Sequence, residues 1–160
     1  MTTRSGIGFD VHPLVEGRAL VLGGVTIPYA RGLAGHSDGD GLIHAIIDAM
    51  LGAAALGDIG THFAPGDARY KGIASSELLT ATISLLRGKR WRVTFVDATI
   101  IAERPILRPH IGDLRHTLAA ILHLDVDCVS VKATTTDGLG FVGRGEGIGT
   151  LAIATIERIA

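Results

Sequence analysis

The chain has 160 residues, of which 47% are hydrophobic and 19% are charged, and its formal net charge is −1. A chain of this length and composition can bury one hydrophobic core, so we expect a single domain over residues 1–160. The weak net charge gives no reason to expect a nucleic acid or an anionic membrane as a partner. The mean hydropathy of +0.38 is high for this size, so we expect part of the apolar surplus to lie between subunits.

The sequence favours a cytoplasmic location. A single cysteine, Cys128, excludes an internal disulfide and fits a reducing compartment. The first residues, MTTRSGIGFD, lack the apolar core of a signal peptide. The most apolar run, AIIDAMLGAAALGDIG, is interrupted by Asp48 and Asp58 and is too short to span a bilayer.

The first part of the chain is predicted to form strands followed by a helix. Residues 6–12 and 18–30 are rich in β-branched side chains and bounded by glycine and proline, which favours strands. Residues 36–57 show helical spacing of apolar side chains. We expect Ser37 and Asp38 to cap this helix.

The middle of the chain is predicted to alternate between helices and a strand. Residues 61–72 are expected to form a loop, and residues 75–88 a second helix with a serine cap. Residues 91–102 alternate as a strand does. A third helix is expected over 108–124, starting at Pro109 because proline is favoured in the first helical turn.

The last part is predicted to contain a strand over 127–136 and a glycine-rich loop over 137–149. The tail, residues 150–160, fits a strand or a helix equally well. This order of elements predicts an α/β (α+β) domain in which a mixed sheet carries helices on one face.

One motif has the composition of a metal site. Asp10 and His12 are two positions apart on an expected strand, so their side chains share a face. His44 lies in the first expected helix. A carboxylate and two histidines are a common ligand set for an open Zn²⁺ site. A strand-end cap and a partly buried helix histidine would give the same pattern, so the motif alone leaves both interpretations open.

Three further segments carry groups that could bind phosphate or a nucleotide. His36 and Ser37 lie in a glycine-bounded loop before a helix, where free N–H groups can bind phosphate, although Ser-Asp there is also ordinary capping. The run from 134 to 136 is three threonines, followed by Asp137, which could hold a hard cation. The two prolines within 102–112 stiffen a loop that could read a base edge or merely join a strand to a helix.

Taken together, these segments resemble one enzyme family. The chain carries, in order, GFDVH, LGGVTIP, HSDGD, ALGDIG, VDATIIAERP, PHI, VKATTT and GRGEG. It thereby resembles the 2-C-methyl-D-erythritol 2,4-cyclodiphosphate synthase family of the non-mevalonate isoprenoid (MEP) pathway. The resemblance implies a phosphorus–oxygen lyase that converts 4-CDP-2-C-methyl-D-erythritol 2-phosphate to the 2,4-cyclodiphosphate and CMP. It also implies a homotrimer with each active site between neighbouring subunits.

The resemblance further implies two metal sites. Asp10, His12 and His44 match the ligands of a Zn²⁺ ion, and a substrate phosphate supplies the fourth ligand. Asp137 matches the ligand of a second divalent cation, Mg²⁺ or Mn²⁺, that bridges the substrate phosphates.

Catalytic and substrate-binding positions follow from the same resemblance. His36 and Thr135 match positions that stabilise the transition state. Phe141 and Arg144 match the lining of a cavity on the trimer axis, a candidate site for an isoprenoid diphosphate. The residues expected to contact substrate are Asp10, His12, His36, Ser37, Asp58, Ile59, Gly60, Phe63, Asp67, Ala102, Ile106, Leu107, Arg108, Thr134, Thr135, Thr136, Asp137, Phe141 and Arg144.

The chain departs from the family pattern at three places. Residues 63–67 read FAPGD where the family usually has FPDTD, so one acid is missing. Ile106 replaces the usual lysine, and we expect Arg108 to supply the charge instead. Asp137 replaces the usual glutamate, which is one methylene longer.

Two other functions remain open at this point. The altered 63–67 segment is the only support for a trimeric binding module that retains the nucleotide pocket without turnover. An unrelated zinc hydrolase would need a base such as Asp48, one turn from His44 on the same helix face. We expect Asp48 instead to orient a ligand histidine, as metal sites commonly require.

Overall fold

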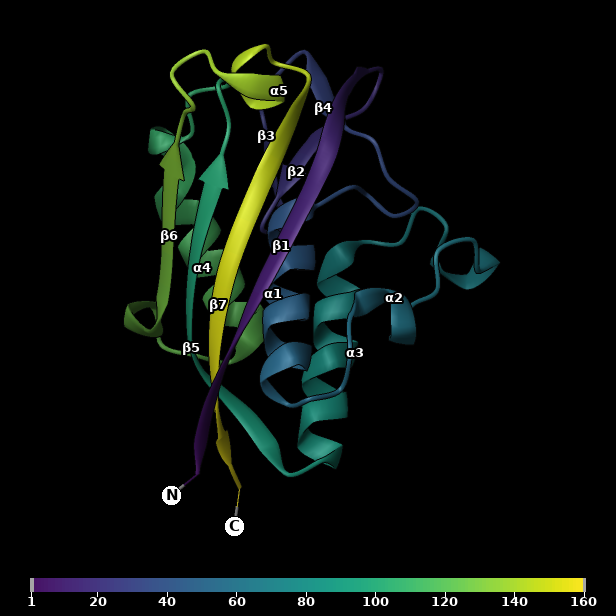
Figure 1. Cartoon of the computed structure of the whole chain (residues 1–160), viewed down its shortest axis with the longest axis vertical. Helices are drawn as coiled ribbons and strands as arrows, with labels where there is room; N and C mark the ends of the chain where they lie inside the picture. The colour runs from purple at the N-terminus through teal and green to yellow at the C-terminus, as the bar shows by residue number, and fades with distance from the viewer. Residues whose placement is uncertain (1, 160) are drawn as a thin grey trace.

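A five-stranded sheet with the strand order β4-β1-β7-β5-β6 forms the centre of the computed structural model, which describes residues 2–159 (Figure 1). Most neighbouring strands are antiparallel, whereas β5 and β6 are parallel, so the predicted mixed sheet is confirmed. The strands are β1 (Thr3–Glu16), β4 (Arg31–Leu33), β5 (Trp91–Ile101), β6 (Val129–Thr134) and β7 (Gly147–Arg158). A separate hairpin is formed by β2 (Leu20–Leu22) and β3 (Val25–Ile27).

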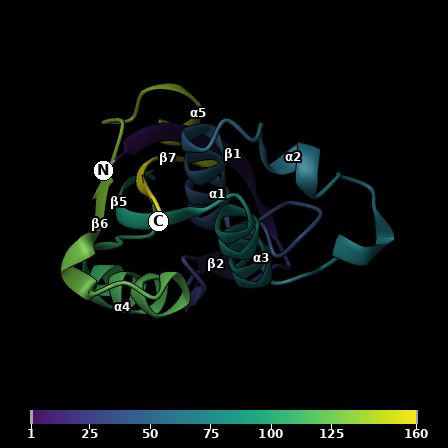
Figure 2. The ribbon, with the colours of Figure 1, turned by 90° about the horizontal axis from the view of Figure 1, so that it is seen from below.

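The main helices cover one face of this sheet, as the sequence predicts (Figure 2). The α-helices are α1 (Gly41–Ala53), α2 (Ile59–His62), α3 (Ser75–Gly88), α4 (Ile111–Leu122) and α5 (Gly140–Gly143). Short 3₁₀ turns occur at Ala68–Tyr70, Arg108–His110 and Val126–Cys128. Among the described residues, no helix is long and apolar enough to cross a membrane.

Helix α1 lies directly on the backbone of β1. A Cβ added at Gly8 would lie 1.9 Å from the carbonyl oxygen of Ala45, and one added at Gly6 would lie 2.2 Å from that of Ala49. Only glycine therefore allows this approach of strand and helix. Because alternate residues of a strand share a face, Asp10 and His12 project from the same face of β1 as the two glycines and therefore point toward α1.

The other face of the sheet is apolar and exposed. Ile7 and Phe9 on β1 are 66% and 59% exposed, and their register partners on β7 are Ile153 and Leu151. Phe95 on β5 is also exposed. A continuous apolar face of this kind is typical of a surface that contacts another protein.

The first helix begins later than predicted, at Gly41, and Asp40 caps it. The buried Asp40 carboxylate accepts hydrogen bonds from the backbone N–H of Ile43 (3.1 Å), Gly23 (2.9 Å) and Gly24 (2.7 Å). It therefore joins the β2–β3 turn to α1. The expected capping by Ser37 and Asp38 was wrong, because residues distant in sequence compete for these side chains.

Other boundaries also differ from the sequence pattern. The second helix has Ala74 at its N-cap, and the Asp38 carboxylate accepts from the N–H of Ser75 (3.0 Å), so the predicted serine cap was wrong. The third helix begins at Ile111 after a 3₁₀ turn, not at Pro109. The ambiguous tail belongs to a strand, β7, which pairs on both sides and is central to the sheet.

Replacing Gly8 by alanine should destabilise the protein by roughly 3 kcal/mol or more, because the new methyl group meets helix backbone that cannot move aside. Gly112→Ala in α4 is the matched control, since nothing lies within 4 Å of its added Cβ. Urea unfolding measures both variants. Equal stability of Gly8→Ala and the wild type would contradict the close approach of α1 to β1.

Candidate functional site

Asp10, His12 and His44 form one cluster, in which β1 supplies the first two residues and α1 the third (Figure 1). Oδ2 of Asp10 lies 2.7 Å from Nε2 of His12 and 3.1 Å from Nδ1 of His44. The two histidine nitrogens are 3.1 Å apart. Among the described residues, this is the only group of three acids, histidines or cysteines close enough to share a metal ion.

The cluster fits a divalent cation in both composition and spacing. Bonds of about 2.0 Å to a tetrahedral zinc ion place neighbouring ligands about 3.3 Å apart, close to the three distances in the cluster. The outer nitrogen of His12, Nδ1, donates to the carbonyl oxygen of Ala34 at 2.5 Å, which leaves Nε2 for the cluster. Such a second partner is typical of histidines that bind metals.

The charges in the cluster shift the pKa values of its members. Burial alone would raise the pKa of the Asp10 carboxyl, but hydrogen bonds and charge from His12 and His44 outweigh it and hold that pKa well below its usual range. Burial opposes protonation of His12, yet the hydrogen bond and charge of Asp10 raise its pKa above the ordinary 6.5. Without a metal, the site therefore attracts protons.

A cavity of about 230 Å³, called the metal-side cavity below, opens beside this cluster. Its lining contains eight residues expected from the sequence: Asp10, His12, His36, Ser37, His44, Ile59, Gly60 and Phe63. It also contains Pro65, Tyr70 and Leu78, which the sequence analysis missed. Pro65 lies in the altered 63–67 segment, and that position could have been found there, whereas Leu78 is an ordinary apolar residue of α3 with no sequence signal.

A second cavity of about 250 Å³ lies where β5 and β6 end. We call it the base-side cavity, because the 102–112 loop beside it was expected to read a base edge. Its expected lining residues are Ala102, Ile106, Leu107, Arg108, Thr134 and Thr135. Glu103, Pro105 and Ala133 line it as well and were missed, although two of them belong to the quoted AERP segment. The two cavities share no lining residue, and Figure 1 shows β6 at the left edge of the molecule and the helix α2 at its right.

The remaining expected residues lie outside these two linings. Asp58 caps α2, and its carboxylate accepts from the hydroxyl of Thr61 at 2.7 Å and from the N–H of Thr61 at 2.8 Å, which lowers the pKa of that carboxyl. The Asp67 carboxylate pairs with Arg69 at 2.6 Å, and hydrogen bonds from that arginine lower its pKa to about 2. The backbone carbonyl of Asp67, however, lies 3.1 Å from Nε2 of His36, so the altered segment still reaches the metal-side cavity.

Residues 137–141 of the glycine-rich segment are exposed, whereas Val142 and the first residues of β7 are buried. Asp137 adopts a left-handed conformation, and its carboxylate accepts a hydrogen bond from the Thr135 hydroxyl at 3.2 Å. Thr136 donates to the carbonyl of Leu139 at 2.6 Å. Farther along, Phe141 is 40% exposed, and the Arg144 guanidinium forms two hydrogen bonds with Glu146 (2.8 and 3.1 Å).

Asp48 was expected to contact a histidine of the cluster, but it contacts another part of the chain. Its carboxylate accepts from the backbone N–H of Ile59 at 2.7 Å, and burial raises its pKa. The expectation that Asp48 orients a ligand histidine was wrong, because the start of α2 takes its oxygen. The hydroxyls of Ser75 (2.9 Å) and Ser37 (3.2 Å) lie against His44 Nε2 instead.

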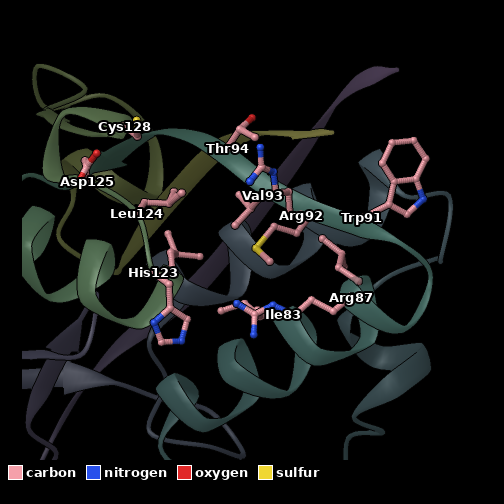
Figure 3. Close-up of a pocket in the computed structure, with 13 residues that line it drawn as sticks. Ile83, Arg87, Trp91, Arg92, Val93, Thr94, His123, Leu124, Asp125 and Cys128 are labelled. Atoms are coloured by element: carbon pink, nitrogen blue, oxygen red, sulfur yellow. The ribbon is translucent and has the colours of Figure 1, made fainter. Parts of the chain in front are cut away.

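A larger cavity, about 730 Å³, lies elsewhere, between α3, the start of β5 and the turn after α4 (Figure 3). Arg87, Arg92 and His123 are among the residues that line it. It contains a histidine, an acid and a cysteine, but these do not form a metal-ligating group. Size alone therefore does not identify the functional site in this protein.

Comparison with known proteins shows the family to which the chain belongs. A family model described as the YgbB family matches residues 3–157. The chain belongs to this family. A relative from Alkaliphilus oremlandii, named 2-C-methyl-D-erythritol 2,4-cyclodiphosphate synthase, is 58% identical over 96% of this chain and 98% of its own length. A relative of the same name from Clostridium perfringens is 54% identical over 97% of this chain and 99% of its own. Both relatives are named as synthases, so this chain, as a member of the same family, is an enzyme.

Solved structures of the family have the same fold. A bifunctional IspDF from Campylobacter jejuni superposes with a TM-score of 0.95 at 39% identity; the match covers 99% of this chain and 43% of that longer protein. A 2C-methyl-D-erythritol-2,4-cyclodiphosphate synthase in a CDP-bound form gives a TM-score of 0.89 at 33% identity, over 96% of this chain and 100% of the other.

Zinc should bind the wild-type protein more weakly at acid pH. Metals bind neutral imidazole, and the raised pKa of His12 means that protons compete from above 6.5. We expect roughly tenfold or greater loss of Zn²⁺ affinity between about pH 8 and about pH 6, measured by competition with a chromophoric chelator. His116→Ala is the control, because this exposed histidine bonds only within α4. A pH-independent affinity would contradict binding at the cluster.

Proposed function

We propose that this protein converts 4-CDP-2-C-methyl-D-erythritol 2-phosphate to 2-C-methyl-D-erythritol 2,4-cyclodiphosphate and CMP, in the cytoplasm. The observation that carries the proposal is the cluster of Asp10, His12 and His44 beside a cavity. The chain that holds it is 58% identical to a relative named 2-C-methyl-D-erythritol 2,4-cyclodiphosphate synthase. In the reaction, an oxygen of the 2-phosphate bonds to the β-phosphorus. The bond from that phosphorus to the α-phosphate oxygen breaks, and CMP leaves with the electron pair.

This chemistry explains the lack of a nucleophile and base pair in the site. The attacking oxygen belongs to a phosphate of the substrate, which is already ionised at neutral pH. Catalysis of phosphoryl transfer therefore consists mainly of positioning and neutralising charge. It needs no covalent intermediate with the protein.

Metal-binding residues would meet the charge requirement. Asp10, His12 and His44 would hold Zn²⁺, and Asp137 would hold Mg²⁺ or Mn²⁺ together with phosphate oxygens of the substrate. When bound, the cations would neutralise and polarise the phosphates that react.

Other side chains would bind and orient the substrate. The exposed His36 ring, whose Nε2 donates to the Asp67 carbonyl, and the hydroxyl of Ser37 line the metal-side cavity, where the hydroxyl can donate to a phosphate oxygen. At the second cavity, the Thr135 hydroxyl, which donates to Asp137 at 3.2 Å, would turn to donate to a diphosphate. The backbone between 102 and 108 curves around that cavity and would bind the cytosine.

A second copy of the chain would bring the two cavities together. In one chain they share no lining residue. The exposed apolar face over Ile7, Phe9 and Ile153 offers a surface for association. We propose that three copies pack by this face around a common axis and that each active site combines the metal-side cavity of one copy with the base-side cavity of its neighbour.

Phe9→Asp should dissociate this assembly, because a charge replaces a 59% exposed aromatic ring on the apolar face. Light scattering after size exclusion should give the mass of a trimer for the wild type and of a monomer for the variant. Leu85→Asp on α3 is the control: it lies on the helical side, is 37% exposed, and should remain trimeric. A monomeric wild type would refute the trimer.

Arg108→Ala should weaken binding of CDP about tenfold, because Arg108 is the exposed cation of the base-side cavity, where Ile106 offers none. Calorimetric titration with CDP measures the change. Arg104→Ala, in the same loop but outside the cavity lining, should bind CDP as the wild type does. Equal affinities of the Arg108 variant and the wild type would remove this residue from the binding site.

The reaction itself is tested by ³¹P NMR on purified protein with Zn²⁺, Mg²⁺ and the CDP substrate. We expect equimolar CMP and cyclic diphosphate, and a loss of at least about 10²-fold in rate for His44→Ala. CMP with an open-chain diphosphate would indicate a hydrolase. CDP binding without any product would indicate a binding module, and the altered 63–67 segment would then be the first cause of the lost turnover to test.

A further inference from the structure

A buried hydroxyl group connects His44 to a carboxylate outside the cluster. Ser75, the first residue of α3, is fully buried. Its Oγ lies 2.9 Å from Nε2 of His44 and 2.5 Å from Oδ1 of Asp38. Asp38 also accepts from the backbone N–H of Ser75 through Oδ2, at 3.0 Å. The carboxylate therefore receives both donors of one residue.

The direction of these hydrogen bonds fixes the proton on His44. An ionised carboxylate only accepts, so the Ser75 hydroxyl proton points to Asp38. The Ser75 oxygen then faces His44 with a lone pair and accepts from Nε2–H. With its proton on Nε2, His44 presents a bare Nδ1 to Asp10 and His12.

His12 is fixed in the complementary way. Its Nδ1 lies 2.5 Å from the carbonyl oxygen of Ala34, which can only accept, so Nδ1 bears the proton and Nε2 is bare. Both rings, when neutral, thus direct lone pairs into the cluster, and in the absence of a metal a proton can occupy that position and be shared with Asp10. A metal requires this arrangement, and an ordinary hydrogen-bonded histidine pair does not.

Ser37 is not an equivalent partner of His44. Its Oγ is 3.2 Å from Nε2, longer than the Ser75 contact, and it also accepts from the N–H of Gly39 at 3.3 Å. Its distance to the Ser75 oxygen is 3.4 Å. No carboxylate fixes the Ser37 proton, so its hydroxyl remains able to donate to a ligand in the cavity it lines.

We propose that Ser75 and Asp38 are positioning residues that hold His44 in the tautomer with a bare Nδ1 and thereby raise the affinity of the cluster for zinc. This inference deepens the proposed function and rests on it, because it concerns the same metal site. The two residues act only through His44. The same contacts attach the loop of His36 and Ser37 to the start of α3, since Asp38 belongs to that loop.

Ser75→Ala tests the inference in two ways. We expect a 10- to 100-fold loss of Zn²⁺ affinity in a chelator competition at constant pH, a range typical of partners behind a metal ligand. In metal-free protein at neutral pH, ¹⁵N–¹H correlation spectra of the His44 ring should show the proton on Nε2 in the wild type and a mixture of tautomers in the variant. Ser76→Ala is the matched control, because its hydroxyl forms no hydrogen bond with any residue that the structure describes.

Asp38→Ala provides an independent variant in case Ser75→Ala fails to fold, which circular dichroism would reveal. It frees the Ser75 hydroxyl to turn and should lower zinc affinity in the same direction. The double variant should lose little more than Ser75→Ala alone, because both act through one hydrogen-bonded chain. Simply additive losses would contradict the chain.

The outcomes separate this inference from the proposed function. Wild-type zinc affinity and an unchanged His44 tautomer in folded Ser75→Ala would overturn the inference and leave the metal site standing. Failure of the wild type to bind zinc would overturn both. Loss of affinity in Ser75→Ala with an unchanged tautomer would assign Ser75 a role in packing rather than in orienting the ring, and would also overturn the inference.

Discussion

No side chain separates β1 from α1 at Gly6 and Gly8, and the cluster of Asp10, His12 and His44 depends on this contact of backbones. If the helix lay a side chain's width away, His44 could not reach the carboxylate of Asp10. The strand period then places Asp10 and His12 on the helical side and the alternating apolar residues Ile7, Phe9 and Val11 on the opposite side. One short stretch of sequence therefore determines both the cluster and the exposed apolar face.

Much of this arrangement could be predicted from the sequence, because it depends on local patterns. The two-residue spacing of Asp10 and His12 indicated a shared strand face, and the helical spacing around His44 indicated the element that brings it near. The order of strands and helices predicted a mixed sheet covered on one face. The tail could not be assigned because β7 carries apolar residues on both faces, the exposed Leu151 and Ile153 and the buried Ala152 and Ala154, so its two-residue alternation in burial does not appear as an alternation of polar and apolar residues.

What the sequence could not predict depends on partners that are distant along the chain. Asp38 and Ser75 are 37 positions apart, and each has the local appearance of an ordinary helix cap. Asp40 joins the helix to a turn 16 and 17 residues earlier. Asp48 was expected at a ligand histidine because of helical spacing, but the start of α2 offered a closer donor. Propensity identifies which side chains can cap or orient, whereas tertiary contacts decide what each one binds.

The position of β7 has a consequence for how the protein is made. This strand lies between β1 and β5, and the hydroxyl of its Thr150 donates to backbone carbonyls of both Gly41 (2.7 Å) and Asp10 (3.3 Å). On the ribosome, β1 and α1 emerge long before residues 147–158, so the centre of the sheet is missing while most of the chain is exposed. Folding must wait for contacts of long sequence separation, which are slow to form. The apolar face and the histidines are therefore open to chaperones and to stray metal ions until synthesis is nearly finished.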